Sequence, residues 1–266
     1  MRRIIIIGTA LAVLVTAGVA LAASSFNSYT GSVTVAPGQA GAVSSPNPVG
    51  ISEKYTAANT TPGWRAAPLK DIQTWIYGVV SDGKDFPKCS PARITANHTL
   101  WDKACPKGSL VGQGATNALL GPGGDATSVG TPCNPYLKAY NGGQGKLVFF
   151  FNEFGPYQCA GLSTGASAPW VARVYRTNGY LVIDSALPPD VSTQAGGLKG
   201  IYGSLILQQL AFPKMTKRVH GRRVAYNASI ACKRGRRPYK YVFTAQNFSN
   251  LGSNAQTGTV SGSQRC

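Results

Sequence analysis

The chain has 266 residues, of which 43% are hydrophobic and 13% charged, with 32 glycines, 17 prolines and a net charge of +17. This length suffices for one large hydrophobic core, and the apolar content excludes a wholly disordered chain. Glycine and proline are too frequent for long helices, and they follow no fixed period, which excludes collagen.

The N-terminus has the three parts of a secretory signal peptide. Met1 to Arg3 is a positive head, residues 4–22 are almost wholly apolar, and Ala20-Leu21-Ala22 is the small-x-small exit read by signal peptidase. The apolar run is about the minimum that spans a bilayer, so a retained membrane anchor is the alternative. We expect a signal peptide at 1–22, a Ser/Gly/Pro-rich extended segment at 23–48, one domain at 49–266, and a secreted or cell-wall-associated protein.

Alternation of apolar and polar residues with period two predicts strands over most of the remaining chain. We expect strands at residues 31–36, 49–56, 69–80, 110–120, 133–141, 146–152, 170–176, 180–187, 200–212, 224–232 and 239–245. Asn178-Gly179 tolerates the positive φ angles of a type I′ turn, so it predicts a β-hairpin. Residues 147–151 are continuously apolar, which is typical of a strand covered on both faces. The pattern predicts an all-β fold, an antiparallel β-sandwich of immunoglobulin-like or jelly-roll-like type, with little helix apart from the signal peptide.

Two cysteines, Cys89 and Cys105, bracket a short loop between two predicted strands. Ser90 can cap a helical turn there, and Pro91 suits its first position because proline lacks an N–H. A bridge between the two cysteines would tie a strand end to a strand start, and we interpret this loop as a structural staple.

Six cysteines in an exported chain indicate three disulfides. They are Cys89, Cys105, Cys133, Cys159, Cys232 and Cys266. A zinc site would need close pairs such as Cys-x-x-Cys, and the sequence contains none. Sequence alone leaves the pairing open, and sequential pairing is the simplest hypothesis because each bridge then closes one local loop.

The stretch Pro-Lys-Cys-Ser at 87–90, followed by Cys-Pro-Lys-Gly-Ser-Leu-Val-Gly at 105–112, resembles a motif of uncharacterised secreted β-rich proteins from soil actinobacteria. Ala-Tyr-Asn at 139–141 and the cysteine-to-cysteine hairpin at 232–266 are also similar. The resemblance implies an immunoglobulin-like or similar sandwich. It carries no assigned activity, and this chain departs from that group in its basic C-terminal third.

A second hypothesis is a secreted serine hydrolase, because Gly161-Leu-Ser-Thr-Gly165 matches the Gly-x-Ser-x-Gly nucleophile elbow. Ser163 would be the nucleophile, with Asp184 or Asp190 and His220 following in the order of α/β-hydrolases. The elbow needs a helix after the serine, whereas the residues that follow lead into a strand. We therefore expect no catalytic residue.

Metal and cofactor chemistry is not indicated by the sequence. His98 and His220 have no ligand-like spacing to other ligands, so we expect no metal site and no cofactor. The acids are few, and no pair of carboxylates is marked by spacing as in a glycosidase.

Every charged residue after Asp190 is basic, and eight of them form two groups. The groups are Lys217, Arg218, Arg222 and Arg223, and Lys233, Arg234, Arg236 and Arg237. The alternatives are solvated loops that keep a protein with few charges soluble, and an anion-binding surface. We predict that the two groups bind anions, with a cell-wall polymer, an acidic glycan or an anionic membrane surface favoured over nucleic acid as partner. One strand between the groups would place them roughly 30 Å apart, at opposite ends of the domain.

Overall fold

The computed structural model describes residues 26–97, 101–152, 159, 167–248 and 255–266. Most of the chain there is β-strand. The largest sheet contains β1 (Asn27–Ala36), β3 (Gly50–Asn59), β4 (Leu69–Tyr77), β6 (Leu110–Pro122), β7 (Thr131–Cys133), β8 (Tyr136–Gly143), β9 (Lys146–Asn152), β10 (Trp170–Thr177), β11 (Tyr180–Ala186), β12 (Ile201–Phe212), β16 (Arg236–Ala245) and β17 (Gln256–Arg265). Two small sheets consist of β2 (Asn47–Pro48), β5 (Val79–Ser81) and β15 (Asn227–Ser229), and of β13 (Thr216–Val219) and β14 (Arg222–Ala225). The helices are short: α1 (Pro91–Thr95), α2 (Pro189–Ser192) and the 3₁₀ turns η1 (Trp101–Ala104) and η3 (Ala195–Gly197).

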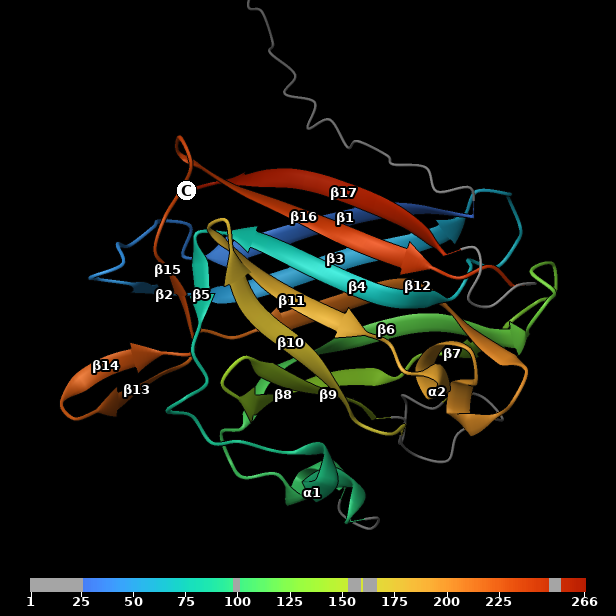
Figure 1. Ribbon diagram of the computed structural model, residues 1–266, viewed down its shortest axis with the longest axis horizontal. Helices are drawn as coiled ribbons and strands as arrows, with labels where there is room; N and C mark the ends of the chain where they lie inside the picture. Colours follow the sequence, from blue (N-terminus) through green and yellow to red (C-terminus); the bar gives the residue numbers. More distant parts are fainter. Residues whose placement is uncertain (1–25, 98–100, 153–158, 160–166, 249–254) are drawn as a thin grey trace, which may run out of the picture.

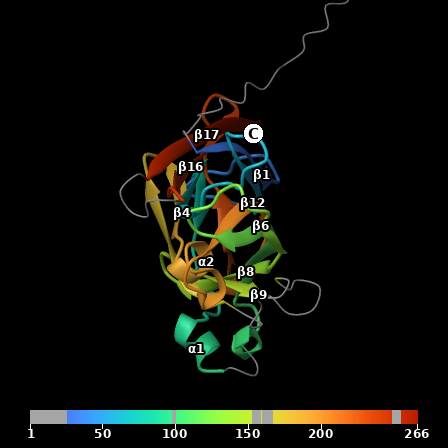
Figure 2. The ribbon, with the colours of Figure 1, turned by 90° about the vertical axis from the view of Figure 1, so that its right-hand side faces the viewer.

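The large sheet curves until its first and last strands meet, which makes a nearly closed barrel. Its order is β1-β3-β12-β6-β8-β9-β10-β11-β4-β16-β17, with β7 beside β6, and Figures 1 and 2 show β17 next to β1. All neighbours along this path are antiparallel. The path has an odd number of strands, so β1 and β17 run in the same direction and cannot be joined by the antiparallel ladder used elsewhere.

The amide of Gln264 joins the two strands at this seam. Its Oε1 accepts a hydrogen bond from the Val35 N–H at 2.8 Å, and its Nε2 donates to the Val35 carbonyl at 2.9 Å. Tyr241 on β16 adds a hydrogen bond from its hydroxyl to the Ser32 carbonyl at 2.8 Å. Side chains therefore do at the seam what backbone pairing does between the other strands.

The barrel interior is filled by alternate residues of each strand. On β4, Ile72, Thr74 and Ile76 are buried, whereas the residues between them are partly exposed, as predicted. Aromatic rings from the two ends of the strand order meet inside, for example Tyr29 of β1 and Phe243 of β16, which stack with centroids 4.4 Å apart.

The stapled loop covers the outer face of β8 and β9. Ser90 caps α1 by accepting a hydrogen bond from the Arg93 N–H at 3.2 Å, as predicted. Ile94 and Trp101 then pack with Phe150, which points outward from β9. Its neighbour Phe149 points into the barrel core. The continuous apolar run is therefore covered on both faces, which confirms that prediction.

The predicted all-β antiparallel class is confirmed, and so is the sequential disulfide pairing. The bridges are Cys89–Cys105, Cys133–Cys159 and Cys232–Cys266. The two layers expected of a sandwich are parts of one continuous sheet. The turn at Asn178-Gly179 has positive φ at both residues, as predicted.

Three expectations need correction. The segment 23–48 contains β1, so the barrel begins well before residue 49. Residues 224–232 do not form one strand, because the chain passes from β14 to β15, which belong to different sheets. The strand β17 was not expected from its polar sequence. No helix in the described part of the chain has the length and apolar character needed to cross a bilayer.

Candidate functional site

The first basic group lies on a hairpin that stands apart from the barrel. Strands β13 and β14 pair only with each other among the described strands, and the hairpin projects at the left of Figure 1. His220 and Gly221 form its tip, with φ angles of 46° and 76°. Positive φ at both central residues is the geometry of a type I′ turn. Histidine tolerates positive φ better than most residues, and this is the signal by which His-Gly could have marked the hairpin in the sequence.

Four cationic side chains are exposed on this short ribbon. They are Lys217, Arg218, Arg222 and Arg223. Arg218 lies directly opposite Arg223 in the strand register. Like charges in this position repel each other. No ion pair with an acid engages either residue among the described side chains.

The ribbon also forms a shallow hollow with polar and cationic walls. Thr216, Lys217, Arg218, Gly221 and Arg223 line it, and Arg223 Nε donates to Thr216 Oγ1 at 3.2 Å. An anionic group placed between the two guanidinium groups would relieve their repulsion and accept their hydrogen bonds. The hairpin therefore has the chemistry of an anion-binding site.

The second basic group is the turn between Cys232 and β16, and three of its four residues are exposed. These are Lys233, Arg234 and Arg236. Arg236 Nη1 donates to the Ser263 hydroxyl at 3.0 Å. These side chains remain candidates for anion binding.

The prediction that Arg237 binds anions at the surface is wrong, because its side chain is only 1% exposed. It points inward from β16, as Tyr241 does. Its guanidinium donates to the Gly38 carbonyl at 3.2 Å and to the Ser229 hydroxyl. Burial lowers the pKa of Arg237 below its usual value. The side chain therefore ties β16 to its neighbours and is not available to a surface ligand.

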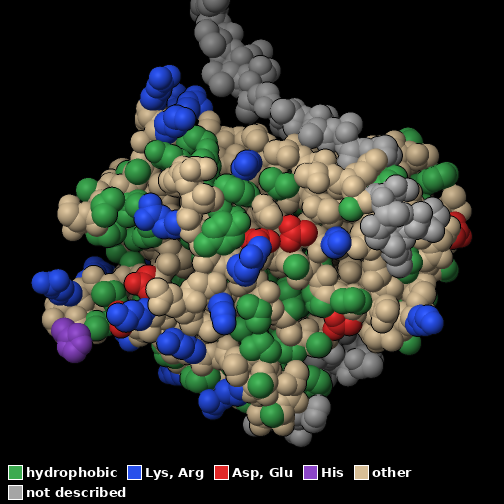
Figure 3. Space-filling model, in the orientation of Figure 1, with side chains coloured by type: hydrophobic (Ala, Val, Ile, Leu, Met, Phe, Trp, Pro, Cys, Tyr) green, Lys and Arg blue, Asp and Glu red, His purple; other side chains and the backbone are tan. Residues whose placement is uncertain are grey.

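The two basic groups do not lie at opposite ends of the domain, as the sequence predicted. Figure 1 places the β13–β14 hairpin and the turn before β16 at the same end of the long axis, and Lys and Arg side chains gather at this end in Figure 3. The reason is the break between β14 and β15, which removes the single long strand expected to separate them.

The residues of the hydrolase hypothesis are not brought together where the structure describes them. Ser163 lies outside the described residues. His220 is exposed at the hairpin tip, whereas Asp190 lies on α2 at the opposite end of the molecule (Figure 1). Asp184 on β11 pairs with Arg173 of β10. No hydrogen bond or ion pair joins His220 to either aspartate in the described chain.

Register brings together two carboxylates that the sequence did not mark. Asp184 faces Gln73 on β4, two residues from Asp71. Burial and the negative charge of Asp184 raise the pKa of Asp71 to about 6. This pairing depends on which strands are neighbours, and a search for close spacing along the chain could not find it. Arg173 already satisfies Asp184, so we assign the pair a structural role.

No group of three or more potential metal ligands occurs among the described residues, and His98 lies outside them.

Comparisons with protein-family models, with curated proteins and with solved structures find no match for this chain. The resemblance to secreted actinobacterial proteins stays a prediction. The three disulfides indicate an oxidising compartment.

Proposed function

We propose that this protein is an exported binding protein that holds an anionic polymer through the basic end of its barrel. The observation that carries the proposal is the cross-strand pair of Arg218 and Arg223, exposed on a ribbon where no acid of the described chain pairs with either. Repulsion between them lowers the stability of the free hairpin, and a bound anion removes that cost.

An extended polymer fits this surface better than a single small anion. The hairpin and the turn at 233–236 are separate basic groups at one end of the molecule. Each group can engage a different charged unit of the same chain, and joined contacts raise the overall affinity by effective concentration. Teichoic acids and acidic glycans carry the required repeated phosphate or carboxylate groups, and the signal-like N-terminus favours the compartment in which they occur.

The test is binding of the protein to teichoic acid, heparin and anionic vesicles across a series of salt concentrations. The variant Arg218→Gln with Arg223→Gln removes two charges from the ribbon. A matched control, Lys70→Gln with Lys107→Gln, removes two exposed charges from other elements. A basic residue at an anionic surface is worth about 1 kcal/mol, so the ribbon variant should bind about thirtyfold more weakly.

Binding by the unchanged protein and by the control should weaken together as salt rises, because exposed charges are screened over about 8 Å at physiological strength. Preference for vesicles over both polymers would redirect the proposal to membranes. Equal loss in the ribbon variant and the control would mean that only net charge matters. Salt-insensitive or absent binding in all forms would leave the basic groups a role in solubility alone.

A further inference from the structure

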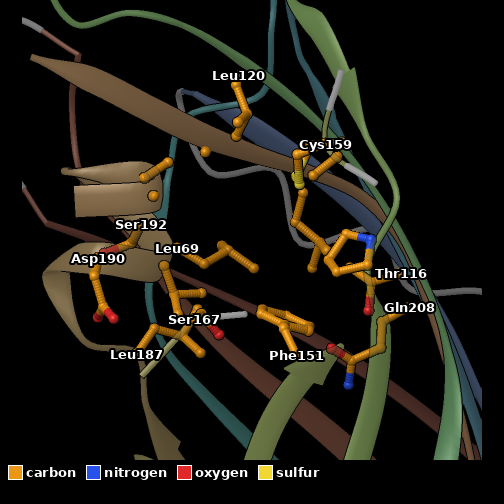
Figure 4. Close-up of a pocket in the computed structure, with 18 of the residues that line it drawn as sticks. Leu69, Thr116, Leu120, Phe151, Cys159, Ser167, Leu187, Asp190, Ser192 and Gln208 are labelled. Atoms are coloured by element: carbon orange, nitrogen blue, oxygen red, sulfur yellow. A yellow bond between two sulfur atoms is a disulfide. The ribbon is translucent and has the colours of Figure 1, made fainter. Parts of the chain in front are cut away.

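Two adjoining cavities lie inside the barrel. Their volumes are about 70 Å³ and about 30 Å³. Both are lined by Ile72, Trp170, Leu187 and Gln208, so they share a wall. The larger cavity reaches α2 at one end of the barrel, and Figure 4 shows it between Thr116 and Gln208 on one side and Ser167 and Leu187 on the other.

The smaller cavity ends at a carboxylate inside the core. Glu53 points inward from β3 and is only 5% exposed. Its Oε2 accepts a hydrogen bond from Thr74 Oγ1 at 3.1 Å. Its Oε1 has no hydrogen-bond partner, and no Lys or Arg forms an ion pair with it, among the described residues.

The larger cavity holds two more polar atoms that have no hydrogen-bond partner in the part of the chain that the structure describes. They are Thr116 Oγ1 and Ser167 Oγ, both buried. Buried polar atoms of folded proteins are nearly always hydrogen-bonded, because an unpaired one loses its interaction with water and gains nothing. Three such atoms around two adjoining, mostly apolar cavities are the pattern of a ligand site, in which few polar groups fix the orientation of an apolar molecule.

We infer that this space binds a short aliphatic amine. The ammonium group would donate to Glu53 Oε1 and supply the positive charge that the protein itself does not place there. The alkyl chain would lie along Ile72, Trp170 and Leu187 toward α2. A cavity of about 150 Å³ holds benzene, so the two cavities together hold roughly four or five non-hydrogen atoms.

Calorimetric titration of the full chain with n-butylamine at pH 8 tests the inference, with 1-butanol as the uncharged probe. The unchanged protein should bind the amine at least tenfold more tightly than the alcohol. Glu53→Gln, which keeps the shape of the side chain, should remove that preference and retain binding of the alcohol. Across ethylamine to hexylamine, each methylene should tighten binding about fourfold until the cavity is full.

A second variant locates the ligand independently of charge. Ala118 lines the larger cavity, and Ala118→Leu should fill it and abolish binding of both probes while circular dichroism stays that of a folded β-protein. The variant with Arg218→Gln and Arg223→Gln should bind n-butylamine normally. The test of amine binding is therefore independent of the test of polymer binding. Equal affinity of the amine for the unchanged protein and Glu53→Gln, or no binding by folded protein, would overturn the inference and assign Oε1 to buried water.

Discussion

Replacing Glu53 with glutamine should stabilise this protein at alkaline pH. Burial raises the pKa of Glu53 from 4.5 to about 7, and the hydrogen bond from Thr74 opposes this rise only in part. Because the folded state holds the proton more tightly than the unfolded state, Glu53 costs no stability below about pH 4.5. The cost grows as pH rises and is complete above about pH 7.

The size of the effect follows from the shift, since one pKa unit corresponds to about 1.4 kcal/mol. Ionised Glu53 should therefore lower the free energy of unfolding by about 3 kcal/mol at pH 8, and glutamine removes this loss. Two buried phenols, Tyr55 and Tyr241, also respond to the carboxylate, because burial and then the charge of Glu53 raise the pKa of both. Both stay neutral across this range, so they do not obscure the titration.

Urea unfolding at pH 5 and pH 8, followed by tryptophan fluorescence with intact disulfides, measures the prediction. Glu53→Gln should match the unchanged protein at pH 5 within about 1 kcal/mol and exceed it by about 3 kcal/mol at pH 8. Asp85→Asn, at a half-buried position in the turn after β5, serves as the control and should show no such gain. A glutamine variant that is less stable at pH 8 would refute the reasoning, since it would mean that the carboxylate makes a favourable contact.

Three further predictions concern the staple, the seam and the N-terminus. Replacing Cys89 and Cys105 with alanine should cost about 3 kcal/mol, by the entropy of the opened loop, in urea unfolding; a change below 1 kcal/mol would show that packing alone holds the loop. Gln264→Ala removes two hydrogen bonds and should speed hydrogen exchange of the Val35 amide about thirtyfold, at about 1 kcal/mol per bond; unchanged exchange would show a seam held by other contacts. The intact mass of the secreted protein should equal that of a chain beginning at Ala23, and a full-length mass in the membrane fraction would contradict cleavage.

Local patterns predicted most strands, because each strand shows one face to a packed interior and the other to solvent. The continuous apolar run at 147–151 also predicted that its strand is covered on both faces, and the stapled loop provides the outer cover. The disulfide pairing was left open by the sequence, and the simplest hypothesis, in which each bridge closes a neighbouring segment, is the one observed. Polar β17 was missed because this strand at the seam buries only Gly258 and Val260.

The candidate site was predicted in composition but not in shape. The sequence identified the basic residues, and the His220-Gly221 signal for a hairpin was overlooked, whereas no local pattern showed that Arg237 turns inward. Alternation along β3 places Glu53 inward, but it does not show that the neighbours of Glu53 come from β4 and β12. Such contacts between distant segments depend on the order of strands, which no local pattern contains.

The meeting of β1 with β17 has a consequence for how the chain acquires its structure. The strand near the start of the barrel finds its last neighbour more than two hundred residues later, in a contact such as Val35 with Gln264. Contacts between such distant positions slow folding, because a long loop must close before they form. Until β17 reaches β1, β1 has one open edge, and such an edge can pair with another chain. A partner that shields this edge while the chain folds should therefore raise the yield of folded protein more than one that acts after β17 is in place.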